Sequence, residues 1–166
     1  LEDLLELISI KLPFDDFSQP IKHKKKEEES PEIFDKKRKI GENDEYICEL
    51  IRNDDLDEFI AYINRTNYPI QDSTIPTSDF DTNNFFHNHY DTSLIEYTAF
   101  FGSIKIFKYL CINNVKLTSS LWLYAIHGRN NEIIQYLEEN NVEPRDKTFI
   151  ECLKEAIKCH HNEIAN

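Results

Sequence analysis

The sequence predicts an all-α protein built as a stack of short helix-turn-helix repeats. An apolar signature recurs along the chain, and each copy divides into two stretches with the residue spacing of amphipathic helices. The 166 residues contain only three glycines and no clean alternation of apolar and polar residues, which argues against a sheet-rich fold.

The clearest repeat relates residues 93–115 to residues 120–142, at an offset of 27. Both copies begin with Ser-Leu, contain a central glycine, and end with Tyr-Leu and then Asn-Asn-Val. Parts of the same signature recur near residues 58–63 and, at an offset of 31, near residues 156–164. Four copies are therefore expected, over residues 43–65, 93–115, 119–142 and 148–166.

Each copy has the pattern of two short helices. In residues 93–115, one apolar stripe begins at Leu94 and another at Ile106, with Gly102 between them where the chain must turn. Asn113 and Asn114 then end the pair, because asparagine tolerates the left-handed conformation. Helices this short are marginal alone, so each is expected to bury its stripe against the next pair.

Before the repeats, the sequence predicts an N-terminal helix over residues 1–17, as the end of a preceding repeat or a cap. Leu1, Leu4, Leu5 and Ile8 share one helical face, and Pro13 ends it. Residues 18–42 are expected to form a charged connector. The chain has no methionine and begins with Leu1, which favours an excerpt of a longer protein.

Charge is unevenly distributed along the chain, whose formal net charge is −12. Residues 22–39 hold eight basic and five acidic residues, so the remainder holds 11 basic and 26 acidic residues. A body this acidic repels nucleic-acid phosphates and anionic membranes, and it favours a partner protein with a basic or mixed surface.

The four cysteines are scattered, which fits a reducing cytoplasmic or nuclear compartment. No apolar run approaches the roughly 20 residues that span a bilayer.

Two segments resemble a known family. Residues 93–102 (SLIEYTAFFG) and 119–128 (SSLWLYAIHG) resemble the ankyrin pattern T-P-L-H-x-A-A-x-x-G. Residues 43–166 as a whole are similar to divergent ankyrin-repeat proteins of parasitic protists, which carry a domain of unknown function. The proline and histidine of the pattern are missing and the offsets are shorter than about 33, so the finger loops are expected to be abbreviated turns.

The resemblance implies an α-solenoid of ankyrin-like repeats that acts as a non-catalytic scaffold and grips a partner protein on its concave face. It also implies that the two residues before each turn glycine are exposed there, which are Phe100, Phe101, Ile126 and His127. The alternatives are a structural subunit of a larger assembly, or a nuclear regulatory protein that uses the basic connector. Trp122 is expected in the core, and the recurring Tyr62, Tyr109 and Tyr136 are expected to be scaffold residues.

About twenty extra residues fall within 66–92, which contains Phe80, Phe85, Phe86 and Tyr90. A loop of that length is often functional. Two interpretations remain open for it: the aromatic residues form a cover over the helices, which we favour, or they form a binding loop.

No catalytic or metal motif stands out, and neither a cofactor nor a small-molecule substrate is expected. Cys152, Cys159, His160 and His161 have the side chains of a zinc site but not a standard ligand spacing. Repeat register explains them as core and turn residues instead. His87-Asn88-His89 has the letters of a nuclease motif without its spacing. Catalytic glycine-rich and nucleophile motifs are missing, so an enzyme is not expected.

The basic cluster Lys36, Lys37, Arg38 and Lys39 is a candidate nuclear-import signal, presented on a flexible strand. The alternative is a solvated linker or an exposed helix. Replacing all four residues by alanine is expected to reduce nuclear accumulation of a tagged protein. An unchanged distribution by fluorescence microscopy would contradict the import hypothesis.

Overall fold

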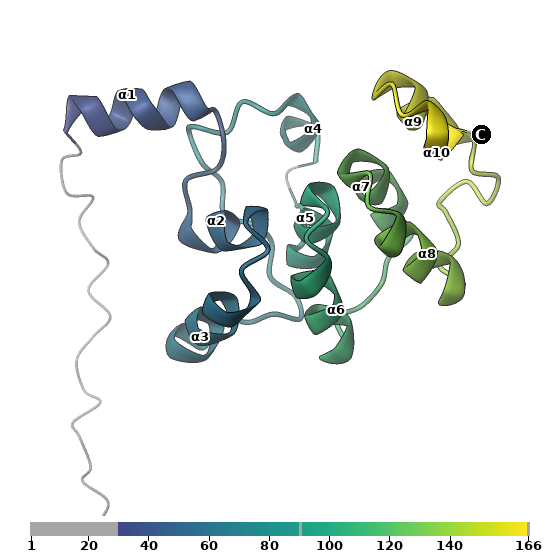
Figure 1. Ribbon diagram of the computed structural model, residues 1–166, viewed down its shortest axis with the longest axis horizontal. Coiled ribbons are helices and arrows are strands. Elements are labelled where there is room, and N and C mark those ends of the chain that lie inside the picture. Colours follow the sequence, from purple (N-terminus) through teal and green to yellow (C-terminus); the bar gives the residue numbers. More distant parts are fainter. Residues whose placement is uncertain (1–29, 90, 166) are drawn as a thin grey trace, which may run out of the picture. The chain divides into compact units, whose positions relative to one another are not determined.

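The computed structural model describes residues 30–89 and 91–165 (Figure 1). The chain divides into two units, residues 1–34 and 35–166. Apart from residues 30–34, which begin a helix that continues past residue 35, the description below concerns the second unit. The expected N-terminal helix over residues 1–17 and the first part of the expected connector, residues 18–29, lie outside the described residues.

The described part of the chain is all-α, as the sequence predicts. Its one β-type pairing is an isolated antiparallel bridge between Thr74 and Ser93. None of the described helices has the length and apolar character needed to cross a membrane. The helices are α1 (Pro31–Ile40), α2 (Tyr46–Arg52), α3 (Leu56–Thr66), α4 (Asn84–His87), α5 (Leu94–Phe101), α6 (Ile104–Ile112), α7 (Leu121–Gly128), α8 (Asn131–Glu139), α9 (Ile150–Lys158) and α10 (Asn162–Ala165).

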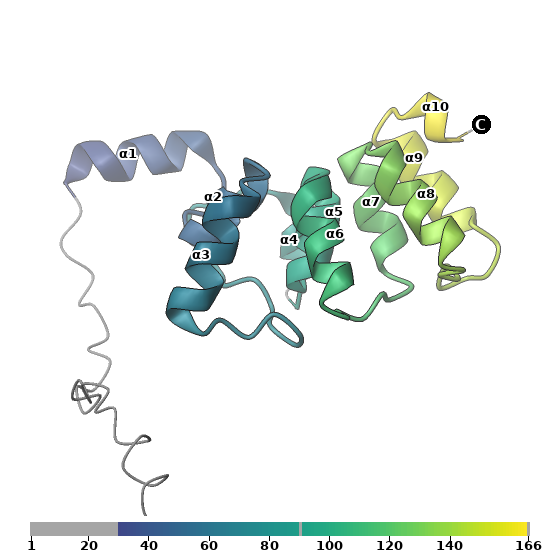
Figure 2. The ribbon, with the colours of Figure 1, turned by 60° about the horizontal axis from the view of Figure 1, so that its bottom comes forward.

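The helices follow one another as pairs: α2 with α3, α5 with α6, α7 with α8, and α9 with α10. The first helices contact each other in the order α2, α5, α7, α9, and the second helices in the order α3, α6, α8. Figures 1 and 2 show these pairs side by side. Their apolar stripes meet in one core, whose largest fully buried side chains include Tyr97, Phe59, Phe107, Ile47, Ile51, Leu94 and Leu121.

Side-chain caps begin several of the helices. Ser93 and Glu96 form a capping box at the start of α5, in which each side chain bonds the other residue's backbone N–H. Asp55 accepts a hydrogen bond from the backbone N–H of Glu58 at the start of α3, and Asn130 caps α8. These caps satisfy backbone donors that short helices leave unpaired.

Left-handed residues end most of the helices. Gly102 adopts φ 67°, and Asn114 and Asn141 adopt φ 60° and 52° directly after α6 and α8. The backbone N–H of the following residue then bonds the carbonyl oxygen five residues back, as from Val115 to Leu110 at 3.1 Å. The expected stop at Asn113-Asn114 is therefore confirmed, and it recurs one pair later.

Hydrogen bonds between consecutive pairs fix how each pair sits on the next. The carboxylate of Asp54, in the turn after α2, accepts hydrogen bonds from the backbone N–H groups of Lys105 and Ile106 at the start of α6 (3.1 Å each). Ser103 Oγ donates to the carbonyl of Ile51 (2.6 Å). Asn130 Nδ2 donates to the carbonyl of Gly102 (2.9 Å).

A buried carboxylate also joins the starts of α5 and α7. Glu96 is only 8% exposed. Its Oε2 accepts from the backbone N–H and the hydroxyl of Ser93 at 2.8 and 2.7 Å, and its Oε1 accepts from Ser120 Oγ at 2.5 Å. One side chain thus caps its own helix and binds the start of the next first helix.

The two glycines of the repeated signature have different roles. Gly102 ends α5 in the left-handed region, as expected of a turn glycine. Gly128 instead lies inside α7, and Arg129 takes the left-handed position with φ 48°. A Cβ atom on Gly128 would lie 2.1 Å from the carbonyl oxygen of Ala99. Glycine is therefore needed there for close approach of α7 to α5, and the expectation of a turn at Gly128 is wrong by one residue.

The recurring tyrosines make similar contacts. The ring of Tyr109 in α6 packs edge-on against Phe59 of α3 (6.1 Å between ring centroids), and that of Tyr136 in α8 packs edge-on against Phe107 of α6 (5.6 Å). Tyr62 in α3 packs instead against Tyr46 (5.4 Å). Each ring stabilises contacts between or within helix pairs, as expected of scaffold residues.

The described part of the charged connector is helical. Helix α1 contains the basic cluster of residues 36–39, and none of its residues is buried. Pro31 occupies the first helical position, Glu32 lies in the first turn and basic residues lie in the last turn, an order that suits the helix dipole. The expectation of a flexible strand is therefore wrong for residues 31–40, and the exposed-helix alternative holds there.

Trp122 and Cys152 are core residues, as expected, at 5% and 7% exposure. Trp122 Nε1 donates to the carbonyl of Val142 (2.6 Å), and its ring meets Phe149 edge-on (4.9 Å). The last pair is less well covered than the others, because Phe149, Ile150, Leu153 and Ile157 are 44–57% exposed.

Candidate protein-binding site

The structure brings together three of the four residues predicted to bind a partner. Phe100 and Phe101 end α5, and His127 lies in the last turn of α7. The ring of Phe100 lies 5.1 Å from that of Phe101 and stacks on the imidazole of His127 (4.9 Å between centroids). All three side chains are half-buried rather than freely exposed.

The fourth residue, Ile126, is 1% exposed, so the expectation that it lies on an open face is wrong. Its side chain lines an apolar hollow together with Trp122 of its own helix, Ile134 of α8 and Ile164 of α10. Helix α7 contacts α5, α8 and α9, and this leaves few of its positions open to solvent.

Helix α4 is what covers the other three residues. The ring of Phe85 lies 4.2 Å from His127, 5.0 Å from Tyr124 and 5.3 Å from Phe100. The ring of Phe86 lies 4.5 Å from Phe100 and 5.2 Å from Tyr97. Two adjacent aromatic residues of one short helix therefore pack onto both α5 and α7.

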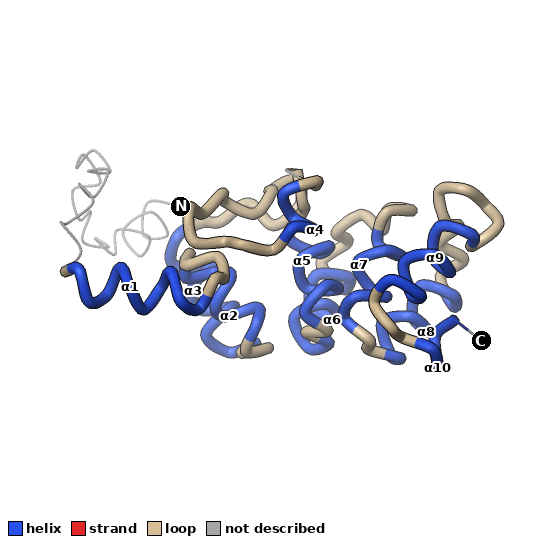
Figure 3. Tube along the Cα trace, turned by 90° about the horizontal axis from the view of Figure 1, so that it is seen from above, coloured by secondary structure: helices blue, strands red, loops and turns tan. Residues whose placement is uncertain are grey.

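Residues 67–92, which include α4, are here called the cover segment, and Figure 3 shows that the described part is mostly loop. Hydrogen bonds hold this segment to the rest of the chain at several points. Ser78 Oγ donates to Asp44 Oδ1 (2.6 Å), and the backbone N–H of Thr82 donates to the carbonyl of Gly41 (3.0 Å). Gln71 Nε2 donates to the carbonyl of Asn113 (2.6 Å). Of the two interpretations of this loop, the contacts of Phe85 and Phe86 support the cover. Tyr90 lies outside the described residues.

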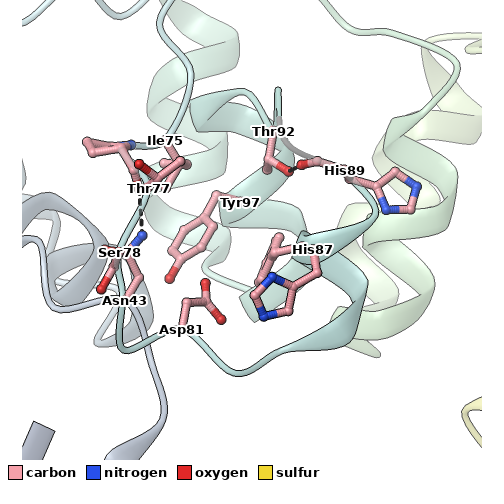
Figure 4. Close-up of a pocket in the computed structure, with 11 residues that line it drawn as sticks. Asn43, Ile75, Thr77, Ser78, Asp81, His87, His89, Thr92 and Tyr97 are labelled. Atoms are coloured by element: carbon pink, nitrogen blue, oxygen red, sulfur yellow. Dashed lines mark hydrogen bonds between the residues drawn. The ribbon is translucent and has the colours of Figure 1, made fainter. Parts of the chain in front are cut away.

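A hollow of about 160 Å³ opens beside the cover segment (Figure 4). Figure 4 shows the ring of Tyr97 among Asn43, Asp81 and His87. Asn43 Nδ2 closes one side by donating to the carbonyl of Pro76 (2.7 Å). The walls thus combine an apolar surface with a few polar groups, a composition that binding sites share.

The hollow contains an aromatic hydroxyl that stays protonated. Tyr97 is 1% exposed, and burial raises the pKa of its hydroxyl well above the ordinary range. That hydroxyl accepts a hydrogen bond from Arg52 Nη1 (3.1 Å). Arg52 also donates to the carbonyl of Asn43 (2.8 Å) and pairs with Glu42 (2.8 Å). Tyr97 therefore forms a fixed, neutral wall.

The rim of the hollow is acidic. Asp81 Oδ1 accepts from the backbone N–H of Asn83 (3.0 Å), and among the described residues Asp81 forms no ion pair. Asp44 is paired with Lys37 (2.9 Å). Partial burial opposes the ionisation of Asp44, but the hydrogen bonds from Ser78 and Lys37 outweigh it and lower its pKa. Asp81, which lines the hollow, therefore favours a positively charged ligand, whereas the charge of Asp44 is already balanced by Lys37.

The histidines of the His87-Asn88-His89 sequence have separate environments. His87 is exposed. His89 Nδ1 bonds the carbonyl of Phe85 (2.7 Å), and its ring stacks on Phe85 (4.4 Å). Thr92 Oγ1 in turn donates to the carbonyl of His89 (2.7 Å). These polar side chains hold the cover segment in place, and the nuclease interpretation gains no support.

The cysteines and histidines at the C-terminal end do not gather as one cluster. Cys152 is in the core, and His160 is exposed in the left-handed turn after α9. Cys159 instead lies beside His127 of α7. Residue spacing within 152–161 could not show this contact, because it joins residues 32 positions apart.

Comparisons with protein-family models, with curated protein sequences and with solved structures found no match to this chain.

The sequence reasoning overlooked the hollow. Asn43 and Asp81 belong to segments without a helical pattern, and nothing in the residue spacing brings residues 43, 81 and 97 together. The one available signal was the density of Asp and Asn around the aromatic residues of the cover segment, which is typical of capped turns.

Replacing Phe85 by alanine is expected to release the cover segment, because the substitution removes the ring that joins α4 to α5 and α7. Cleavage at Asp72, Asp79 and Asp81 by an Asp-specific protease should become clearly faster. The free energy of unfolding should fall by about 1–3 kcal/mol, less than for a fully buried phenylalanine.

The control for this variant is His87→Ala, in the same short helix but with an exposed side chain. It should leave both the cleavage rate and the stability near the wild-type values. Equal cleavage of the Phe85→Ala variant and the wild type would mean that α4 does not hold the segment.

Proposed function

We infer that this chain is a non-catalytic scaffold that binds a partner protein through a surface built on an ankyrin-like stack. The binding surface consists of the cover segment, the first helices α5 and α7 beneath it, and the hollow beside Tyr97. The partner presents a basic segment, one side chain of which enters the hollow.

The helix pairs support the ankyrin-like interpretation. They coincide with the repeated signature, since α5 with α6 and α7 with α8 fall within residues 93–115 and 119–142. Consecutive first helices contact each other, and consecutive second helices do the same. Stacks of this kind use their first helices and loops for extended protein contacts.

The observation that carries the proposal is the fixed cover segment with a hollow beside it. Long loops held in one conformation by a scaffold are frequent sites of recognition. Here the segment forms hydrogen bonds to Gly41 and Asp44, which precede α2. It also packs on α5 and α7 through the side chains of α4. A surface ordered in advance loses less conformational entropy on binding.

The chemistry of the hollow selects a basic side chain. The aliphatic stem of a lysine or arginine can pack on the rings of Phe86 and Tyr97, which line the hollow, while its charged end meets Asp81. Long-range electrostatic attraction also favours a basic partner, because the chain outside residues 22–39 holds 26 acidic and 11 basic residues.

The polar contacts favour binding over catalysis. A nucleophile and its general base would share a hydrogen bond. Around this hollow, His89 bonds the carbonyl of Phe85, and Thr92 bonds the carbonyl of His89 and the hydroxyl of Tyr124. The side chains of His89 and Thr92 therefore stabilise the conformation of the cover segment.

Binding can be measured with the immobilised chain and a set of lysine-rich, arginine-rich, neutral and acidic peptides. Basic peptides should be retained, with an affinity that falls as salt is raised. Asp81→Asn keeps the oxygen that accepts from Asn83 but removes the charge, and it should weaken binding about tenfold, or ~1.4 kcal/mol.

The matched control is Glu139→Gln, the same change of charge at an exposed position in the last turn of α8. This variant should bind within about twofold of the wild type, since one distant charge changes the overall field little. Equal retention of basic and acidic peptides, or equal losses in the two variants, would contradict a site at Asp81.

A further inference from the structure

We propose that His127, Glu155 and Cys159 form a binding site for a zinc-like transition-metal ion between α7 and α9. This site shares His127 with the partner-binding surface, and it joins the last helix pair to the rest of the stack.

Three different ligand types converge there. His127 Nε2 lies 3.0 Å from Glu155 Oε1, and Cys159 Sγ lies 3.5 Å from His127 Nδ1 and 3.7 Å from Nε2. One ligand atom from each of the three residues can be chosen so that all lie within 4.8 Å of one another. Imidazole nitrogen, carboxylate oxygen and thiolate sulfur are the three donors that zinc uses in proteins.

The separations suit a tetrahedral ion. With zinc–nitrogen and zinc–oxygen distances of about 2.0–2.2 Å and a zinc–sulfur distance of about 2.3 Å, nitrogen and sulfur ligands lie ~3.6 Å apart, and nitrogen and oxygen ligands ~3.4 Å apart. The observed separations from Nε2 are 3.7 Å to the sulfur and 3.0 Å to the oxygen. Because the sulfur is nearly equidistant from the two ring nitrogens, the imidazole or the thiol must rotate before one nitrogen and the sulfur can bind the same ion.

Helix geometry explains why Glu155 and Cys159 lie on the same face of α9. Glu155 is in α9, and Cys159 follows one turn later as the residue that ends the helix. Positions four apart lie above one another on a helix. His127 reaches them from α7, which packs against α9. Such a site would join elements from the third and fourth helix pairs.

The surroundings of His127 and Glu155 favour a neutral imidazole and an ionised carboxylate, the forms that bind a cation. Desolvation lowers the pKa of His127 despite its bond to Glu155, so the imidazole is neutral near pH 7. Partial burial opposes the ionisation of Glu155, but hydrogen bonds from Lys158 and His127 outweigh it and lower its pKa. Lys158 Nζ bonds Glu155 Oε2 (2.9 Å), which leaves Oε1 directed at His127. An oriented ligand of this kind favours metal binding.

A further histidine lies near the site. Electrostatic interaction with His161 contributes to the lowered pKa of His127. His161 Nδ1 is buried and has no hydrogen-bond partner. A buried polar atom without a partner is uncommon and calls for an explanation. His161 is not among the three residues whose ligand atoms lie within 4.8 Å of one another, so its side chain would have to move to become the fourth ligand. A water molecule is the alternative, and the variant His161→Ala distinguishes the two.

The same three side chains could instead form a thiol nucleophile, its base and an orienting carboxylate. One geometric observation favours the metal. Cys159 lines neither the hollow beside Tyr97 nor the apolar hollow around Ile126.

Cobalt(II) is the probe, because its absorption reports both a thiolate ligand and four-coordinate geometry. The full chain, stripped with a chelator and kept reduced, should bind one Co²⁺ and show a sulfur-to-metal band in the near ultraviolet. Cys159→Ser should abolish this band, and His127→Gln and Glu155→Gln should each weaken Co²⁺ binding at least tenfold, as loss of a ligand requires. His161→Ala should weaken binding only if His161 is the fourth ligand.

Cys111→Ser is the matched control, since Cys111 is also half-buried but lies on α6. It should leave the band unchanged. Zinc at about 100 times its Kd should raise Tm by about 5–10 °C in the wild type and in Cys111→Ser, but not in Cys159→Ser.

The absence of a sulfur-to-metal band from folded wild-type chain would overturn the proposal. Equal loss of the band in the Cys111 and Cys159 variants would also overturn it. If Cys159 instead reacts with iodoacetamide faster than Cys111 at neutral pH, in a manner that depends on His127, the site is a thiol nucleophile and not a metal site.

Discussion

The close approach of α7 to the end of α5 is the constraint on which the rest of the structure depends. At Gly128 the two backbones are so near that a single methyl group would overlap the carbonyl oxygen of Ala99. Asn130 bonds the carbonyl of Gly102 in the same region, and Glu96 joins the starts of the two helices. With α5 and α7 fixed at this spacing, the C-terminal halves of the two helices lie close enough together for Phe85 and Phe86 of α4 to pack on both.

The local pattern of the sequence predicted much of this fold. Helix pairs, the left-handed stop at Asn114 and the core position of Trp122 follow from apolar spacing and from the preferences of single residues. The features that were missed depend on contacts between distant residues. Ile126 is buried because α7 is flanked on several sides, and α4 exists because Phe85 and Phe86 find partners in α5 and α7.

The candidate sites show the same division. The ankyrin resemblance indicated Phe100, Phe101 and His127 as exposed binding positions, but only the tertiary structure shows that the cover segment packs on them. Spacing within 152–161 gave no standard zinc pattern, and it could not show that Cys159 lies beside His127. The proposed metal site instead takes one ligand from α7 and two from the end of α9. His127 takes part in both proposals, because its ring contacts Phe85 of α4 and its nitrogens lie beside Glu155 and Cys159 at the end of α9.

The free energy of unfolding of the variant Gly128→Ala, measured with urea, tests the central constraint most directly. Helix propensity alone favours alanine over glycine by about 1 kcal/mol, so a stack without the close contact would gain stability. The close approach predicts a loss of about 1–3 kcal/mol, because α5 and α7 must move apart. Gln135→Ala, at an exposed position of α8, should stay within ~0.5 kcal/mol of the wild type. A Gly128→Ala variant as stable as the wild type, or more stable, would contradict the account.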